Sequence, residues 1–195
     1  MHDTIALPYG GSHAATEDED AVIRAARADP AAFAPLYRRY RDRVYWYVRA
    51  RTATDEDAAD LTQQIFAQAV AALGQYRPGR GSFAAWLFAI ARHALANFHR
   101  RHRPTIAWDA LPAALHPVAA DDPLAAALRR EDLGRVRALV DALDADKREL
   151  LVLRFVAHLT IREIAAVIGK SEAATHKRLT RTLHALAVQF EGVDQ

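Results

Sequence analysis

The stretch 160-TIREIAAVIGKSEAATHKRLTRTLHAL-186 decides the fold of the C-terminal part of this chain. Its first half predicts a short amphipathic helix, because Thr160 and Glu163 stand in the spacing of a capping box and the isoleucines at 161, 164 and 168 share one apolar face. Gly169 is expected to end this helix, since glycine adopts the left-handed backbone conformation of a helix C-terminus without steric cost.

The second half predicts another helix after a tight turn. Ser171 can cap it, and its apolar stripe consists of Leu179, Leu183 and Leu186. Its outward hydrogen-bond donors are His176, Lys177, Arg178 and Arg181. Two short helices in this order are typical of a helix-turn-helix, whose second helix lies in the major groove of DNA. The alternative is a helix pair packed in a bundle, with a solvated basic face.

Composition indicates folded domains and more than one kind of partner. The chain has 195 residues, of which 51% are hydrophobic, which is enough for two small domains. The formal net charge is only +2, but residues 16–20 and 55–60 are acidic whereas residues 92–103 and 176–181 are basic. Such segregation predicts separate surfaces for different partners, one of them a nucleic acid.

Several classes of function are excluded by the residues present. There is no cysteine, which removes disulfides, thiolate zinc sites and a cysteine nucleophile. The serines lack the context of a nucleophile elbow and no P-loop occurs, so we expect neither an enzyme nor a cofactor. Arginines surround His93, His99 and His102 and would repel a cation, so we expect no metal site. The longest apolar run, residues 83–91, is too short to span a bilayer, and without a secretory signal the expected location is the cytoplasm, without membrane insertion.

The chain divides into an all-α pair of small domains. Residues 1–19 lack periodicity and are expected to form a disordered tail. Residues 20–103 read as a first helical domain, residues 104–123 as a proline-rich linker, and residues 124–195 as the domain that carries the helix-turn-helix. Nothing in the sequence has the alternation of a strand.

Two helices of the first domain present distinct faces. In the helix around residues 57–66, Leu61 and Ile65 fall on a core face and Asp60 and Gln64 on another. The next helix is capped by Ser82, and its apolar stripe comprises Phe83, Leu87, Ile90, Ala94 and Phe98. Beside that stripe lie Trp86, His93, Asn97 and Arg100, which can stack on bases, donate to base edges and neutralise phosphate. The alternatives are an ordinary solvated face and, for Trp86, a place in the core.

Taken in order, these segments resemble the bacterial RNA polymerase sigma factors of the extracytoplasmic-function (ECF) type. The resemblance covers residues 20–187. Its first part rests on segments 33–40, 57–66, 76–78 and 83–92, and its second part on segments 143–155 and 160–181. It implies binding to core RNA polymerase, through the β′ clamp helices and the β subunit, and to promoter DNA.

The resemblance also implies roles for individual residues. The polymerase contact would comprise Asp57, Asp60, Leu61, Gln63 and Gln64. Recognition and melting of the −10 element would fall to Arg77, Arg80, Ser82, Trp86, His93, Asn97, Arg100 and Arg101, with a base flipped into the loop at 77–82. Recognition of the −35 element would fall to Ser171, Glu172, Ala174, Thr175, His176, Lys177, Arg178 and Arg181.

This chain departs from the family pattern at the polymerase contact. Family members commonly carry acidic residues where Ala59 and Gln64 stand. One hypothesis is that phosphorylation of Thr52, Thr54 or Thr62 restores negative charge there, since a phosphate adds about −1.5 to −2 charges. Control by an anti-sigma factor is the commoner arrangement in the family and is the default expectation.

Two other functions fit the same patterns. A conventional helix-turn-helix regulator would bind an operator without core polymerase, with the first domain serving for dimerisation or sensing. An adaptor would bind proteins through the first domain and carry a basic hairpin only incidentally. Transcription from a promoter in the presence of core polymerase separates these alternatives from a sigma factor.

Overall fold

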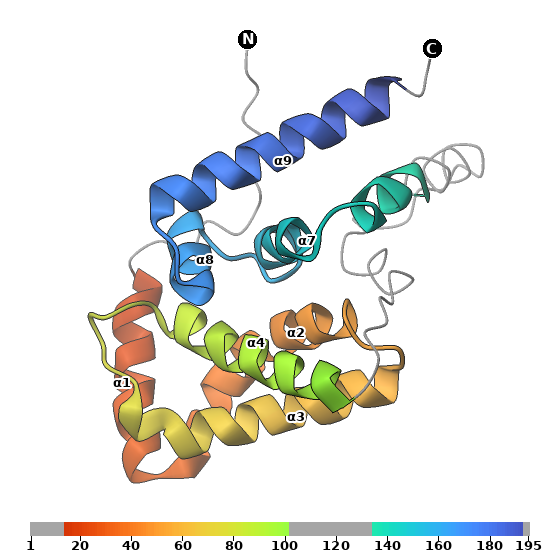
Figure 1. Cartoon of the computed structure of the whole chain (residues 1–195). Coiled ribbons are helices and arrows are strands. Elements are labelled where there is room, and N and C mark those ends of the chain that lie inside the picture. Colours follow the sequence, from red (N-terminus) through yellow and green to blue (C-terminus); the bar gives the residue numbers. More distant parts are fainter. Residues whose placement is uncertain (1–13, 102–133, 193–195) are drawn as a thin grey trace, which may run out of the picture.

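The computed structural model of the chain describes residues 14–101 and 134–192, and within these ranges it is built from helices without any strand. Figure 1 shows two layers: a lower bundle formed by the first half of the chain, and an upper group in which the long C-terminal helix runs across the top. The predicted linker, residues 104–123, and the start of the predicted second domain lie outside the described residues. No helix in the described ranges is long and apolar enough to cross a membrane.

The lower bundle contains four helices joined by short turns. The helices are α1 (Ala14–Ala28), α2 (Ala34–Arg49), α3 (Asp55–Ala72) and α4 (Phe83–Arg101). A 3-10 turn precedes α2 (η1, Pro30–Phe33) and another follows α3 (η2, Leu73–Gln75). The starts of these elements have chemical causes: Asp29 caps η1 ahead of Pro30, Thr54 caps α3, and Ser82 Oγ accepts a hydrogen bond from the Ala85 amide at the start of α4. The helices are interrupted near residues 29, 52–54 and 77–81.

The helix α4 lies at the centre of the molecule. Its predicted stripe is buried at Phe83, Leu87 and Ala94, but Phe88 and Leu95 on another side are buried as well. The reason is that α4 packs against α2, α3 and α8, so it is covered on more sides than a single amphipathic stripe anticipates.

The predicted disordered tail, residues 1–19, is wrong at its C-terminal end. Helix α1 begins at Ala14, and the Glu19 side chain is buried. Its Oε1 atom accepts hydrogen bonds from the Tyr40 hydroxyl at 2.6 Å and from Arg39 Nη1 at 3.1 Å. These partners stabilise a buried carboxylate, and they lie too far along the chain for local sequence to reveal them. Residues 1–13 are outside the described part of the chain.

The upper group begins with helical residues 134–141 and continues through α7 (Ala145–Leu151), the π-helical turn η4 (Val152–Val156), α8 (Ile161–Ile168) and α9 (Glu172–Gly192). The predicted capping box of Thr160 and Glu163 is confirmed, as are the left-handed Gly169 (φ 67°) and the Ser171 cap. The helix-turn-helix is therefore formed by α8 and α9.

The apolar stripe predicted for α9 is partly wrong. Leu179 is buried, but Leu183 is 38% exposed, and Thr175 and Thr182 take the buried positions instead. Their hydroxyls donate to Ser171 O and Arg178 O, both at 2.9 Å, within the same helix. A threonine whose hydroxyl is satisfied in this way can be buried as a small apolar group, so the buried face of α9 passes through Thr175, Leu179 and Thr182 and leaves Leu183 exposed.

Candidate nucleic-acid interface

The surface predicted to grip a protein partner lies along α3. Asp60, Gln63 and Gln64 are exposed and Asp57 is half-buried, so their polar groups are available to a partner. Leu61 is only 4% exposed and belongs to the core, so its predicted part in the contact is wrong. It lies on the core-facing side of α3, next to the polar row, because a helix turns by about 100° per residue.

Of the three threonines proposed as phosphorylation sites near the polymerase contact, only one is accessible to solvent. Thr52 and Thr62 are buried, so their hydroxyls are not accessible to a kinase. Thr54 is exposed and caps the helix, with its hydroxyl donating to Asp57 Oδ2 at 2.8 Å and accepting from the Asp57 amide at 3.0 Å. Next to it, a hydrogen bond from Arg49 lowers the pKa of the Asp55 carboxyl. The hypothesis is therefore wrong for Thr52 and Thr62, and Thr54 remains a prediction.

The loop between η2 and α4 exposes two of the predicted DNA contacts, Arg77 and Arg80. Gly79 (φ 88°) and Gly81 (φ 149°) have backbone angles that other residues rarely adopt. The Tyr76 hydroxyl donates to Gly81 O at 3.1 Å and thereby closes the loop. The loop conformation is set by these internal contacts, and its cationic side chains face solvent.

An aromatic surface adjoins this loop. Trp86 is half-buried, and its ring centroid lies 5.4 Å from that of Tyr76 and 5.5 Å from that of Phe83. The core interpretation of Trp86 is therefore confirmed in part, because the indole packs against these rings, whereas base stacking by its accessible part stays a prediction. Such a partly exposed ring can stack on an unpaired base.

The remaining predicted contacts of α4 form an exposed row. It consists of His93, Asn97, Arg100 and Arg101. Arg100 donates a hydrogen bond to Asn97 Oδ1, so these two side chains are presented together. The cations at the end of α4 also lie near the negative end of the helix dipole, which stabilises the helix whether or not they bind phosphate.

On α9, most of the residues predicted to contact DNA are exposed. They are Ser171, Glu172, Ala174, His176, Lys177 and Arg181. Thr175 is only 1% exposed and donates to the backbone of its own helix, so its predicted contact with DNA is wrong. Arg178 is half-buried, because its Nη2 atom contacts Asp146 Oδ2 at 3.1 Å and Asp144 Oδ1 at 3.6 Å.

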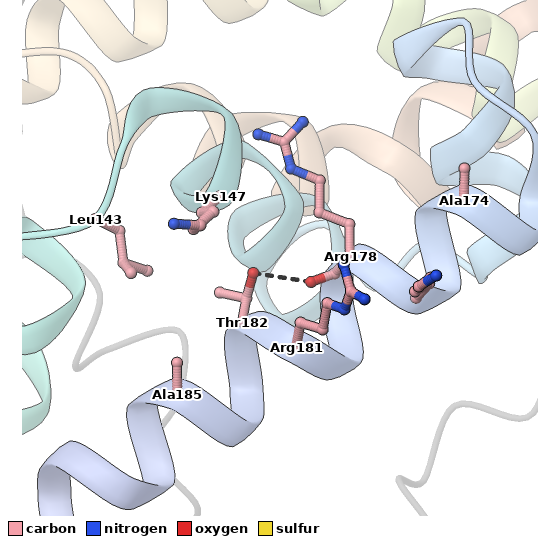
Figure 2. Close-up of a pocket in the computed structure, with 8 residues that line it drawn as sticks. Leu143, Lys147, Ala174, Arg178, Arg181, Thr182 and Ala185 are labelled. Carbon is pink, nitrogen blue, oxygen red and sulfur yellow. Dashed lines mark hydrogen bonds between the residues drawn. The ribbon is translucent and has the colours of Figure 1, made fainter.

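A basic cleft of about 590 Å³ lies between α9 and the start of α7. It is lined by Leu143, Lys147, Ala174, Lys177, Arg178, Arg181, Thr182 and Ala185. Figure 2 shows Arg178 extending from α9 towards α7, with Lys147 on the opposite wall. Four cationic side chains around one cleft favour an anionic ligand such as the DNA backbone.

Sequence reasoning missed the contacts that join the two halves of the chain. Arg43 of α2 donates to Ala157 O at 2.8 and 2.7 Å and to His158 O at 3.3 Å. The Ser82 hydroxyl at the start of α4 donates to Glu163 Oε1 of α8 at 2.7 Å. Since these partners are separated by 81 to 115 residues, no local spacing could have revealed them.

Glu149 of α7 is a third junction between the halves. It accepts hydrogen bonds from the Tyr47 hydroxyl at 2.9 Å and from Arg51 Nη2 at 2.5 Å, and Arg92 of α4 lies 4.0 Å from it. Burial, followed by the Glu149 charge, raises the pKa of Tyr47, so this tyrosine stays a hydrogen-bond donor. Together with the packing of α8 on α4, these contacts hold the two halves in a closed arrangement.

Two family models match the chain in order. The model described as Sigma-70 region 2 matches residues 36–105, and the model described as Sigma-70, region 4 matches residues 133–186. The chain is 32% identical over 172 residues to the ECF RNA polymerase sigma factor SigD of Mycobacterium tuberculosis, a match that covers 86% of this chain and 81% of SigD. It is 31% identical to the ECF RNA polymerase sigma factor BldN of Streptomyces coelicolor, over 85% of this chain and 63% of BldN.

Solved structures share the fold. CnrH, solved in complex with the cytosolic domain of CnrY, is similar with a TM-score of 0.63 at 24% identity, covering 88% of this chain and 96% of CnrH. The sigma factor RpoE of Bartonella quintana, solved with the anti-sigma factor NepR, is similar with a TM-score of 0.50 at 19% identity, covering 94% of this chain and all of RpoE.

Proposed function

The chain belongs to the ECF RNA polymerase sigma factors, and we propose that its two helical domains divide promoter recognition between them while α3 holds core RNA polymerase. The observation that carries this proposal is the ordered match to sigma region 2 and sigma region 4, in a chain whose relative SigD is matched over most of its length. Transcription initiation directed by this chain follows from family membership, whereas the roles of individual residues are our inference.

Core polymerase is proposed to bind the exposed polar row on α3. Asp60, Gln63 and Gln64 offer carboxylate and amide groups on a rigid helix, and Asp57 extends the row towards the cap at Thr54. The partner surface is the β′ clamp helices. Because Gln64 replaces an acidic residue of the family pattern, this contact depends more on amide hydrogen bonds than on charge.

The −10 element is proposed to be opened by the loop at 77–82 together with α4. Arg77 and Arg80 neutralise the backbone, and the accessible side of Trp86 receives an unstacked base. Extruding a base costs a few kcal/mol, so a surface that binds only the extruded base shifts the equilibrium towards open DNA without any bond chemistry.

The −35 element is proposed to be read by α9. The two promoter elements are named for positions about 25 base pairs apart, which is roughly 85 Å along B-DNA. In the closed arrangement α8 packs directly on α4, and Ser82 is bound to Glu163. One chain cannot span both elements in that arrangement, so the closed form is proposed as the resting state and the two domains separate when the chain is loaded on polymerase.

A regulatory protein is the partner proposed to act on the resting state. The relatives CnrH and RpoE were each solved with a bound protein, and that of RpoE is an anti-sigma factor. A partner of that kind would hold the two domains of this chain and keep α3 or α4 from polymerase and promoter.

Mapping of transcription start sites after overexpression tests the proposal. Wild-type chain should create new start sites that share one −10 and one −35 sequence, and the Asp60→Arg variant should create none at equal protein level. Start sites that are unchanged by the wild-type chain, or that are retained by Asp60→Arg, would contradict it. Repression of existing transcripts without new starts would support the operator-binding regulator instead.

A further inference from the structure

Two carboxylates contact a cation that lines the cleft between α7 and α9, where a purely electrostatic DNA-binding surface would have none. Asp144 and Asp146, at the start of α7, both contact Arg178 of α9. A DNA strand is repelled by carboxylates, so their presence next to the recognition helix requires an explanation other than attraction of phosphate.

The two carboxylates are held in different ways. Asp144 caps α7: its Oδ1 accepts from the Lys147 amide at 2.8 Å, and its Oδ2 lies 3.0 Å from Lys147 Nζ. These contacts lower the pKa of Asp144, so it stays ionised at neutral pH. Asp146 lies two residues further along, and its side chain is 74% exposed, with the carboxylate 3.1 Å from Arg178 Nη2.

The contact leaves most of the guanidinium available. Both carboxylates are contacted through Nη2 alone, and the Arg178 side chain remains 41% exposed at the edge of the cleft. Nη2 carries a second hydrogen, and Nη1 and Nε carry further ones. The guanidinium can therefore still donate two hydrogen bonds to the two acceptors of one base. The four cations of the cleft also outnumber the two carboxylates, so the surface still favours a DNA strand.

We propose that Asp146, assisted by Asp144, is a positioning residue that holds the Arg178 guanidinium ready for one base pair of the −35 element. The inference rests on the proposed function of α9. An arginine that is already anchored at one nitrogen loses less rotational freedom when it binds a base. The anchor therefore raises the affinity for a duplex with the matching base pair, and it does not change the affinity for a mismatched duplex, where the arginine binds no base. Asp146 therefore raises sequence specificity even though its charge alone would weaken DNA binding.

Holoenzyme, assembled from core polymerase and the full chain, tests this on promoter duplexes that differ only at the −35 element. Asp146→Asn should lower affinity for the matched duplex roughly three- to tenfold and leave affinity for mismatched duplexes unchanged. Arg178→Ala should remove discrimination at the same base pair, and Asp146→Asn should cause no further loss in the Arg178→Ala background. Asp144→Asn, which keeps the helix cap, should have a smaller effect in the same direction because its contact is longer.

The sign of the effect is decisive. Asp141→Asn is the matched control, because Asp141 is an exposed carboxylate of the same domain that pairs with Arg137 instead. Higher or unchanged affinity of Asp146→Asn for the matched duplex, or a loss that persists in the Arg178→Ala background, would overturn the inference. A loss equal on matched and mismatched duplexes, with a lower unfolding temperature, would make the contact purely structural and also overturn it. If wild-type holoenzyme itself does not discriminate the −35 element, the proposed function fails rather than the inference alone.

Discussion

The Ser82 hydroxyl and Glu163 Oε1 are 2.7 Å apart, so one hydrogen bond joins the first turn of α4 to the residue that caps α8. Both residues also serve their own helices: Ser82 Oγ accepts from the Ala85 amide, and Glu163 Oε2 accepts from the Thr160 amide and hydroxyl. The groups that start α4 and α8 therefore also bind each other. Breaking this contact on opening leaves both caps in place, so the domains can separate without unfolding.

Glu149→Gln should destabilise the closed arrangement. The substitution keeps the shape of the side chain but removes the charge that holds Arg51 and attracts Arg92, and hydrogen bonds to charged groups are worth about 1.5–3 kcal/mol. Because the chain has no cysteine, dyes can be placed at the exposed positions Ala96 and His184 after substitution by cysteine. Energy transfer between them should fall in Glu149→Gln and not in the control Glu56→Gln. Equal transfer in all three proteins would show that Glu149 does not hold the domains together.

Acidification should also favour opening. Burial, together with the cations Arg43 and Arg154, lowers the pKa of His158, so the closed chain keeps this imidazole neutral. Opening removes Arg43, which raises the pKa again, so the open form binds the proton more tightly. The closed form should therefore lose stability as the pH falls through about 6.5, the ordinary histidine value.

The same pair of dyes reports this effect of pH. Energy transfer should drop between pH 7.5 and pH 5.5 in the wild-type chain. His158→Asn is the control, because asparagine tolerates the positive φ of 52° at this position and does not titrate in this range. An equal drop in His158→Asn would assign the pH dependence to another group.

Thr54→Ala should lower the stability of the first domain by about 1 kcal/mol, because it removes the cap of α3. For a chain of this size that corresponds to a fall in Tm of about 2–4 °C, measurable by calorimetry. Thr54→Ser should restore most of the loss, since serine caps as well as threonine. A Tm unchanged in Thr54→Ala would mean that the cap does not determine the stability of α3.

Asp60→Arg should weaken binding to core polymerase at least fivefold, which is about 1 kcal/mol, because it reverses the charge of the most exposed carboxylate on the α3 row. Biolayer interferometry with immobilised core measures the change. Asp141→Arg, which makes the same charge change in the other domain, should bind as wild type does. Equal binding by Asp60→Arg would move the polymerase contact away from α3.

Contacts between residues close together in the chain could be predicted from the sequence, and contacts between distant residues could not. The caps at Thr160, Ser171 and Ser82 were predicted correctly because a cap and its partner are three residues apart. The burial of Thr175 in place of Leu183 was not predicted, because hydropathy alone does not indicate that a threonine hydroxyl is satisfied by its own helix.

The partners of Glu19 and Glu149 show the same limit across greater distances. Glu19 meets Tyr40 after 21 residues, and Glu149 meets Tyr47 after 102 residues. From sequence alone, an acidic residue is expected to be exposed to solvent when no partner lies nearby in the chain. The end of the N-terminal tail and the contacts between the two halves could therefore be found only from the structure. The surfaces of α3, α4 and α9 were easier to predict, since exposed polar rows follow helical periodicity.

Run-off transcription with purified core polymerase of the source bacterium tests the central claim most directly. A linear template carrying a promoter mapped in vivo should yield one transcript of defined length when the wild-type chain is added. Core alone, or core with Asp60→Arg, should yield none. A wild-type chain that binds the duplex yet gives no transcript above that of core alone would contradict the account.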